Sequence, residues 1–370
     1  MGKSILFFLL WGFMGIHGAK AQNTLLNQNI DSNNKICIGA YYFGGWQSLN
    51  NNIHLTSLLK TNFQNREPKW GWVTGTQQIM NKQIVAASDA GISFFSFCWY
   101  DRGNKTVKQA NPDLYYFNHS PEKNKLKFCL MVANHKGSEI GPNEWQVVTS
   151  KWLRQFQFSN YLKVDGKPLI IFFTVGALVK KFGSPAKVAR AMKEFQEKSK
   201  SKGFAGVELA ACIGPGVKQI ERAKACGFQI FTGYNYHTAG LRNAHQKQKL
   251  PIDSMQAAEK RIWNAFAKNT SEKYMPVVTL NWDPRPWATK KNKYNTKPCF
   301  VGYSPNSVYK SVAQAINWVK QNPKITTSPK IILLYAWNEY GEGGYLTPTK
   351  NGVNFLNGLK RAIDESKSKN

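Results

Sequence analysis

The feature of this sequence that most constrains its fold is a series of eight short apolar runs separated by longer amphipathic segments. The runs are typical of strands buried on both faces, and they occupy residues 35–42, 92–100, 126–133, 168–174, 206–212, 229–234, 275–282 and 330–337. A helical spacing of apolar residues occurs at 76–90, 143–158, 184–202, 216–226, 254–268, 304–321 and 351–365. Eight buried strands alternating with helices predict an α/β fold, a parallel sheet closed as a single (β/α)8 TIM barrel.

A doubly wound open sheet is the alternative arrangement for the same alternation. That fold normally has a glycine-rich phosphate loop after its first strand, whereas residues 41–46 read Tyr-Tyr-Phe-Gly-Gly-Trp and contain no G-x-G-x-x-G. The barrel is therefore favoured. No linker and no internal repeat divides the chain, so one barrel domain is expected over residues 22–370.

The first 21 residues have the pattern of a signal peptide. Lys3 precedes an apolar run at 5–16, and the segment closes with Ala19-Lys20-Ala21, a small-x-small cleavage pattern. A membrane anchor is the alternative, but the run is shorter than the roughly 20 residues that a span requires. We expect cleavage near Ala21 and an exported protein, periplasmic or secreted.

The last predicted strand carries the residues most suggestive of chemistry. Its apolar run ends in Trp337-Asn338-Glu339-Tyr340-Gly341-Glu342, so one turn can direct Glu339 and Glu342 into the same small volume. Paired carboxylates beside aromatic faces suit glycosidic bond cleavage, in which one acid protonates the leaving oxygen and the other helps the anomeric carbon react. The alternative is a solvated turn that happens to hold two glutamates, which the aromatic flanks disfavour.

In a barrel, the active site lies at the carboxyl ends of the strands, and residues suited to sugar binding recur there. Aromatic faces stack on sugar rings, while amides, carboxylates, His and Arg hydrogen-bond to hydroxyls. The predicted substrate-binding residues are Tyr41, Tyr42, Trp46, Trp99, Tyr100, Asn134, His135, Tyr236, His237, Trp282, Asp283, Arg285, Trp337, Asn338 and Tyr340. For Asp283 and Arg285, an internal ion pair that braces a loop is an equally open interpretation.

Charge and cysteine content limit the partners. With 50 Lys and Arg against 21 Asp and Glu, the surface attracts polyanions, but the lysines are scattered and no nucleic-acid motif accompanies them. The expected partner is an oligo- or polysaccharide, with an anionic glycan left open, no nucleic acid and no membrane span. Buried free thiols are expected of most of the cysteines, which are Cys37, Cys98, Cys129, Cys212, Cys226 and Cys299. Their spacing resembles no zinc site, and we expect no metal or cofactor.

In several stretches the chain resembles the glycoside hydrolase family 99-like proteins, which include the WbsX-like group and are related to family 71. The resembling stretches are 38–44, Arg66 to Trp72 (REPKWGW), 90–100 (AGISFFSFCWY), 131–135, 161–172 (YLKVDGKPLIIF), 282–287 and 336–348 (AWNEYGEGGYLTP). The resemblance implies a (β/α)8 barrel and retaining hydrolysis of an α-linked glycan, with α-mannosides favoured. Tyr340-Gly341 differs from the Trp-His expected between the two glutamates.

By the motif Asn-Glu-x-x-Glu-Gly, the family's catalytic pair falls on Glu339 and Glu342. The resemblance implies that Glu339 takes the proton from the sugar 2-hydroxyl to form a 1,2-anhydro sugar, while Glu342 is the general acid and then base. Two alternatives remain: a non-catalytic glycan-binding barrel, and a glycosyl-transferring enzyme of polysaccharide biosynthesis. The leader disfavours the second, because nucleotide-sugar donors are cytoplasmic and no phosphate loop is visible.

Overall fold

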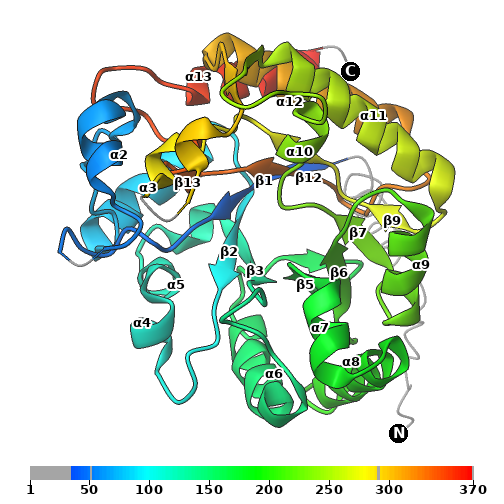
Figure 1. The fold of residues 1–370 in the computed structure, drawn as a ribbon. Helices are drawn as coiled ribbons and strands as arrows, with labels where there is room; N and C mark the ends of the chain where they lie inside the picture. Colours follow the sequence, from blue (N-terminus) through cyan, green and yellow to red (C-terminus); the bar gives the residue numbers. More distant parts are fainter. Residues whose placement is uncertain (1–34, 51, 290–291, 369–370) are drawn as a thin grey trace, which may run out of the picture.

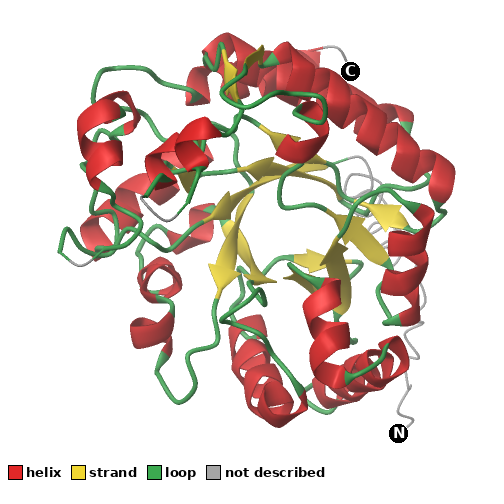
Figure 2. Ribbon diagram, viewed as in Figure 1, coloured by secondary structure: helices red, strands yellow, loops and turns green. Residues whose placement is uncertain are grey.

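The described residues form a barrel of parallel strands inside a ring of helices (Figures 1 and 2). The computed structural model describes residues 35–50, 52–289 and 292–368, so the predicted signal peptide at 1–21 lies outside the described residues. The barrel strands are β1 (Ile36–Tyr42), β2 (Phe94–Trp99), β3 (Lys127–Val132), β5 (Lys167–Phe172), β6 (Glu208–Cys212), β7 (Ile230–Thr232), β9 (Lys273–Tyr274), β10 (Val277–Thr279) and β12 (Lys330–Tyr335). The predicted eight-strand pattern is confirmed, with the seventh strand divided into β9 and β10.

The division of the seventh strand does not open the barrel. β7 pairs with β9, β10 pairs with β12, and β12 pairs with β1, all in parallel. Between the two pieces, the Met275 amide donates to Phe231 O at 2.9 Å and Leu333 N donates to Pro276 O at 2.9 Å. Pro276 has no N–H to give to the ladder, which explains why the strand is interrupted there. The ring of eight strands is therefore complete.

Helices cover the outside of the barrel, as the red ring in Figure 2 shows. They are α2 (Ser57–Asn62), α3 (Gln77–Asp89), α4 (Val107–Ala110), α5 (Pro112–Asn118), α6 (Pro142–Phe156), α7 (Val175–Phe182), α8 (Pro185–Lys200), α9 (Val217–Ala225), α10 (His237–Gly240), α11 (Asp253–Asn269), α12 (Pro305–Gln321) and α13 (Leu356–Ser368). The seven predicted helices are confirmed as α3, α6, α8, α9, α11, α12 and α13. The five others are short helices in the loops, which the apolar spacing did not reveal.

Smaller elements decorate the loops. The additional strands are β4 (Lys163–Val164), β8 (Lys249–Pro251), β11 (Cys299–Val301), β13 (Asn338–Glu339) and β14 (Gly344–Tyr345), and short 3-10 helices occur at Gln64–Arg66, Lys123–Lys125, Arg285–Trp287 and Tyr294–Thr296. β8 pairs with β11, and β13 pairs with β14 to form a hairpin after the last barrel strand. That hairpin holds the two glutamates.

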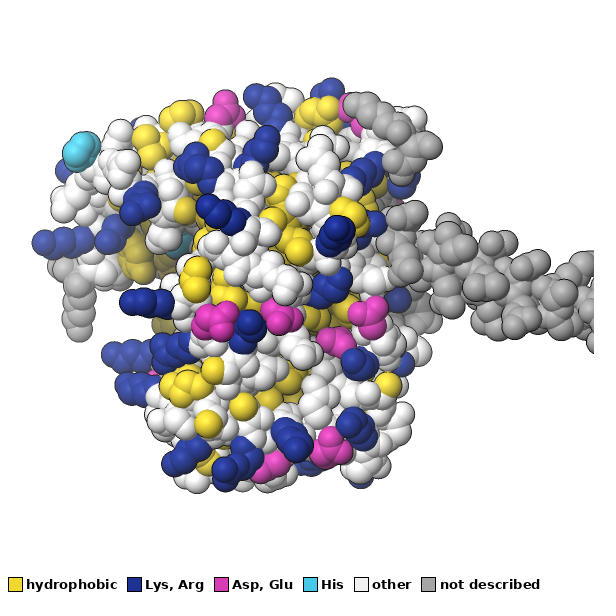
Figure 3. Space-filling model, turned by 90° about the vertical axis from the view of Figure 1, so that its right-hand side faces the viewer, with side chains coloured by type: hydrophobic (Ala, Val, Ile, Leu, Met, Phe, Trp, Pro, Cys, Tyr) yellow, Lys and Arg dark blue, Asp and Glu magenta, His cyan; other side chains and the backbone are white. Residues whose placement is uncertain are grey.

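The cysteines and the surface follow the pattern expected from the sequence. All six cysteines are free, and all except Cys212 are buried, which confirms their prediction as small apolar side chains. Within the described ranges, no helix has the length and apolar character needed to cross a membrane. The face in Figure 3 shows Lys and Arg side chains spread widely, with fewer acids among them.

Candidate active site

Glu339 and Glu342 lie on the hairpin of β13 and β14, directly after the last barrel strand. Glu342 N donates to Glu339 O at 3.2 Å, so a tight turn brings the two residues close together. Gly343 has φ +78°, a backbone conformation that glycine adopts at little cost. Gly341 lies against the Trp287 ring, where a Cβ would approach the ring to 2.4 Å. The glycines of the sequence motif thus permit both the turn and the close aromatic packing.

The backbone of this turn is fixed from two neighbouring loops. Arg66, which is 5% exposed, donates through Nη1 to Tyr340 O at 2.9 Å and to Asp283 O at 3.1 Å. Asp283 N donates in turn to Glu342 O at 2.7 Å. Because these bonds hold carbonyls on both sides of the turn, the positions of the two glutamates depend on the Arg66 and Asp283 loops.

Asp283 forms ion pairs with both Arg66 and Arg285 and does not line the cleft. Burial raises the pKa of its carboxyl, but the hydrogen bonds and charges of Arg285 and Arg66 outweigh burial and hold the pKa below its usual value. The bracing interpretation of Asp283 and Arg285, left open by the sequence, is the arrangement found. Arg66 lies in one of the stretches that carry the family resemblance, but the sequence did not predict its role in bracing the turn.

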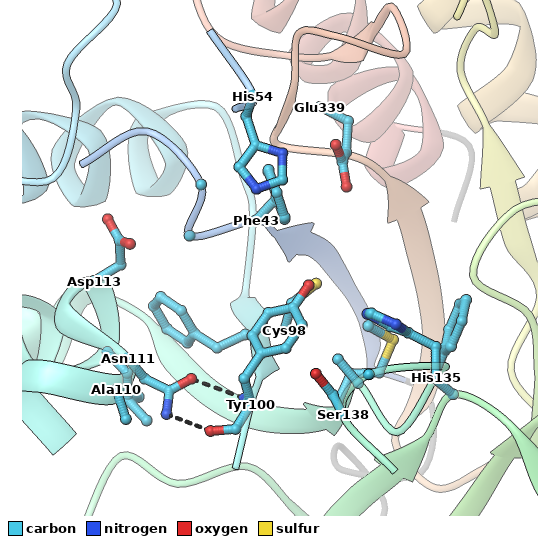
Figure 4. A pocket seen from close by; sticks show the side chains of 18 of the residues that line it. Phe43, His54, Cys98, Tyr100, Ala110, Asn111, Asp113, His135, Ser138 and Glu339 are labelled. Carbon is cyan, nitrogen blue, oxygen red and sulfur yellow. Dashed lines mark hydrogen bonds between the residues drawn. The ribbon is translucent and has the colours of Figure 1, made fainter. Parts of the chain in front are cut away.

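A cavity of about 500 Å³ lies beside the hairpin and is lined by both glutamates. In Figure 4 the Glu339 carboxyl points toward a space bordered by the rings of His54, Tyr100 and His135. Asp113 and Asn111 border the same cavity on the far side from His135, and Phe43 also lines it. The two carboxyls therefore converge on one hollow large enough for a monosaccharide.

A second compartment of about 650 Å³ adjoins the first, and Phe173, Tyr234 and Glu342 line both. Its wall includes His237 and Trp282, whose rings stack at 3.6 Å with an interplanar angle of 6°. Burial lowers the pKa of His237 to about 4, so the imidazole is neutral at physiological pH. Glu342 thus stands where two compartments of one cleft meet.

Two tyrosine hydroxyls hold the glutamates. Tyr234 Oη donates to Glu339 Oε1 at 2.5 Å, and Tyr335 Oη donates to Glu342 Oε2. Burial raises the pKa of both phenols, so they remain protonated donors. Each carboxyl accordingly has a fixed orientation and one oxygen engaged by a neutral donor.

Burial also raises the pKa of both carboxyls. The pKa of Glu342 rises to about 7, and that of Glu339 is also raised, first through burial and then because Glu342 brings a second negative charge. Two close buried carboxyls resist ionising together, so the pair holds one proton in the neutral range. An acid and a base are then available in the same site, which is the requirement for acid and base catalysis.

The structure brings only part of the predicted substrate-binding set to the cleft. Tyr100 and His135 line the first compartment, and Tyr236, His237 and Trp282 line the second. The side chains that it does not bring to either compartment are Tyr41, Tyr42, Trp46, Trp99, Asn134, Asp283, Arg285, Trp337, Asn338 and Tyr340.

Strand alternation explains much of this division. Tyr41 packs on Tyr234 with ring centroids 4.9 Å apart, whereas Tyr42 points to the opposite face and donates to Asp113 Oδ1 at 3.3 Å. Trp99 likewise packs on Trp152 of α6. Position at a strand end therefore does not determine which face a side chain takes.

Several other predicted residues support the site from behind. The Asn338 side chain accepts from Phe43 N and donates to Phe43 O, both at 2.8 Å, and Trp46 Nε1 donates to Asn338 O at 2.9 Å. The Trp46 ring also packs on Tyr340, with centroids 4.9 Å apart. These contacts join the loop after β1 to the glutamate hairpin.

Two further braces complete the predicted set. Trp337 Nε1 donates to Gln83 Oε1 at 2.7 Å, which ties the end of β12 to helix α3. Asn134 exchanges hydrogen bonds with the Thr174 backbone at 2.8 and 2.9 Å and joins the loops after β3 and β5. The Trp337 ring nitrogen and the Asn134 amide thus have their hydrogen-bond partners within the protein and are not free for a sugar.

Sequence reasoning did not single out the two tyrosines that hold the glutamates. Tyr335 lies within the apolar run at 330–337, and Tyr234 ends the run at 229–234, so both resembled core residues. Their signal was a hydroxyl at the carboxyl end of a buried strand. Elsewhere in the described chain, no group of three or more His, Cys, Asp and Glu side chains is placed to hold a metal ion.

Comparison with family models identifies the family of this chain. A model of the family described as "Glycosyltransferase WbsX" matches residues 43–359. No curated protein matches the chain in sequence.

The similar solved structures share the fold. The GH99 endo-alpha-mannosidase from Bacteroides thetaiotaomicron is 15% identical with a TM-score of 0.63, and its complex with BIS-TRIS-Propane is 14% identical with a TM-score of 0.62. Each match covers 90% of this chain and 97% of that chain. A "Glycoside hydrolase-like protein" is 14% identical with a TM-score of 0.58, over 89% of this chain and 94% of that one. At such identities the likeness establishes the barrel.

Proposed function

This chain belongs to the glycosyltransferase WbsX family, and from that premise we propose that it is an exported retaining glycoside hydrolase of an α-linked glycan. The observation that carries the proposal is the convergence of Glu339 and Glu342 on one cavity, each held by a tyrosine hydroxyl. An α-mannoside is the favoured substrate. The fold shared with GH99 endo-alpha-mannosidase supports this choice.

The proposed reaction has two steps. In the first, Glu339 removes the proton of the sugar 2-hydroxyl, O2 attacks the anomeric carbon, and Glu342 protonates the departing oxygen. In the second, Glu342 takes a proton from water, the water oxygen attacks the anomeric carbon, and the bond from that carbon to O2 opens as O2 recovers a proton from Glu339. Two inversions give retention. The route needs a 2-hydroxyl anti to the leaving group, as an α-mannoside provides.

The protonation state fits these roles once substrate is bound. Without substrate, burial raises the pKa of both carboxyls, so the pair shares one proton. A 2-hydroxyl that donates to Glu339 stabilises its anion, and a glycosidic oxygen that accepts from Glu342 stabilises its protonated form. Substrate binding thus favours the state that the first step requires, in which Glu342 carries the proton and Glu339 is ionised.

The decisive experiment compares wild type with Glu342→Gln and Glu339→Gln on a panel of α-linked mannosides and other α-glycans. We expect both variants to lose hydrolysis while Glu342→Gln still binds the substrate. Proton NMR of the first product should show the α-anomer, since the reaction retains configuration. Hydrolysis by Glu342→Gln at the wild-type rate, or a first product with inverted configuration, would contradict the mechanism.

A second candidate function is glycosyl transfer, which the family description favours. The same 1,2-anhydro sugar can be opened by a sugar hydroxyl in place of water, so the two activities share every residue of the site. Adding an acceptor oligosaccharide distinguishes them: a transferase yields longer products in preference to free sugar. A glycan-binding protein without activity is the third candidate, and it predicts binding with no product from any glycan of the panel.

Export is the part of the proposal that depends on the sequence alone. Residues 1–21 carry the leader pattern, and cleavage after Ala21 would make Gln22 the first residue. Mass spectrometry of the protein recovered from outside the cytoplasm tests this point. An N-terminus at Met1 in protein retained in the cytoplasm would refute it.

A further inference from the structure

Three cationic side chains line the cleft. Arg102 and Lys136 border the first compartment, and Arg222 of helix α9 borders the second. All three are exposed. Within the described residues, none of the three forms an ion pair with a carboxylate. Their charge is therefore directed at whatever occupies the cleft.

The acid adjacent to Arg102 in the sequence is engaged elsewhere. Asp101 adjoins Arg102, but its Oδ1 accepts from Lys151 Nζ at 2.7 Å. The Arg102 guanidinium instead lies 5.2 Å from the ring centroid of Tyr100, which lines the same compartment. The aromatic face thus holds this cation at the cavity rather than at a carboxylate.

The carboxylates that line the cleft do not oppose an anionic ligand strongly. Asp113 borders the first compartment but is only 3% exposed, and its two oxygens accept from Tyr42 and Gln47. Burial also raises the pKa of Asp113 to about 7. The other two acids are Glu339 and Glu342, which share a proton. The fixed charge of the cleft is consequently positive.

Arginine is enriched among the cations that line the cleft. Arg accounts for nine of the 50 Lys and Arg residues in the chain, yet two of the three unpaired cations at the cleft are Arg. The guanidinium fork matches carboxylate and sulfate oxygens in a two-point hydrogen bond, which ammonium groups cannot form. Recognition of a planar or tetrahedral oxyanion is the chemistry these side chains offer.

We propose that the glycan bound by this cleft carries acidic substituents, carboxylate or sulfate, on both sides of the reacting bond. Arg102 and Lys136 bind the acidic groups in the first compartment, and Arg222 binds those in the second. This inference rests on the proposed function, because it names the substrate class of the same site. The excess of basic residues over the rest of the surface also raises the local concentration of such a polymer.

The test uses pairs of glycans that differ only in their acidic groups. An α-mannan is compared with its chemically sulfated form and with its form oxidised at C6 to the uronate. We expect kcat/KM for at least one acidic form to exceed that for the neutral parent by about tenfold at low salt. The advantage should shrink near 1 M salt, where the screening length is about 3 Å. Whichever acidic form is preferred identifies carboxylate or sulfate as the recognised group.

A pair of double variants separates the cleft cations from net charge. Arg102→Gln with Lys136→Gln removes two charges at the cleft. Lys202→Gln with Lys268→Gln removes two charges at the carboxyl ends of helices α8 and α11, Lys202 just beyond α8 and Lys268 in the last turn of α11, at the opposite end of the barrel. We expect the cleft variant to lose several times more activity on the acidic glycan than on the neutral one. The control variant should keep the preference of wild type.

Three results would overturn the proposal: a neutral glycan cleaved as well as its acidic forms, an equal loss on both substrates in the cleft variant, or the same change of preference in the control variant. Failure of the underlying function looks different. In that case no glycan is cleaved, while calorimetry with the same glycans still reports whether acidic groups improve binding through Arg102, Lys136 and Arg222.

Discussion

The described part of the barrel buries glutamates in two places with different surroundings. At the carboxyl end, Glu339 and Glu342 face a cavity and each accepts a bond from a tyrosine. On helix α11, Glu259 is 0% exposed, accepts from Thr279 N with Oε1, and has no partner for Oε2. It lines neither compartment of the cleft.

Burial raises the pKa in both places, so a raised pKa does not by itself identify a catalytic acid. The difference lies in what surrounds the carboxyls: a second carboxyl, oriented donors and open space in one case, close-packed protein in the other.

The largest effect is expected from removing the acid of the cleft. Glu342→Gln should lower kcat by about 10² to 10⁴-fold, because the amide cannot protonate the leaving oxygen. Its melting temperature should stay near or above that of wild type, since a buried carboxyl that resists ionisation is replaced by a neutral isostere. Steady-state kinetics and calorimetric melting measure the two quantities. A comparable loss of activity in Glu259→Gln would contradict the distinction between the glutamates of the cleft and the buried Glu259.

The next effect concerns the ion pair that supports the hairpin. Arg66→Met leaves the Tyr340 carbonyl of the hairpin without its Arg66 donor and breaks a buried ion pair, which typically costs about 3–5 kcal/mol of unfolding free energy. Arg285→Met is the matched control, because Arg285 is partly exposed and Asp283 retains Arg66. Its expected cost is about 1 kcal/mol or less. Urea unfolding measures the unfolding free energy of both variants. Equal losses in the two would contradict the supporting role of Arg66.

A smaller effect is expected from the tyrosines. Tyr234→Phe removes a hydrogen bond to Glu339 worth about 1.5–3 kcal/mol, which corresponds to a fall of roughly 10- to 100-fold in kcat/KM. That bond lowers the pKa of Glu339, so the acid limb of the pH profile should move upward in the variant. Tyr161→Phe removes another buried hydroxyl, one bonded to Leu169 O, and should leave the pH profile in place. A shared shift in both variants would indicate a general structural effect.

The smallest effect is expected at Glu259. The pKa of Glu259 in the folded protein lies above the unfolded value near 4.3. The contribution of Glu259 to the unfolding free energy is therefore fully present below about pH 4 and is lost as the pH rises toward the folded pKa. Glu259→Gln cannot ionise, so it should lose less unfolding free energy than wild type between about pH 4 and 7. Glu339 and Glu342 contribute the same trend to both proteins and cancel in the difference. If the unfolding free energies of wild type and Glu259→Gln changed with pH in parallel, the assignment of a raised pKa to Glu259 would be wrong.

The barrel could be predicted because its eight strands are apolar on both faces, and periodicity detects such runs directly. The sequence did not predict the split of the seventh strand at Pro276, where the apolar run continues across a residue that cannot donate to the ladder. The short helices α4 and α10 were missed for a related reason, since four residues contain too little periodicity to recognise.

The candidate site was predictable where sequence spacing fixes geometry. The three-residue separation of Glu339 and Glu342 suffices to place both in one turn. Elsewhere the outcome depends on which face of a strand a residue takes, and a shift of one residue separates Tyr41 inside the barrel from Tyr42 outside it. The family resemblance is confirmed by the match over residues 43–359, while the catalytic roles of the glutamates stay predictions.

Glu342 borders both compartments, and this position has a consequence for how a long substrate is degraded. If the reacting bond lies at Glu342, each compartment accommodates sugar units from one side of that bond, so attack does not require a chain terminus. Early cuts would then fall in the interior of the polymer. The viscosity of a polysaccharide solution should collapse while only a small fraction of its reducing ends has been released.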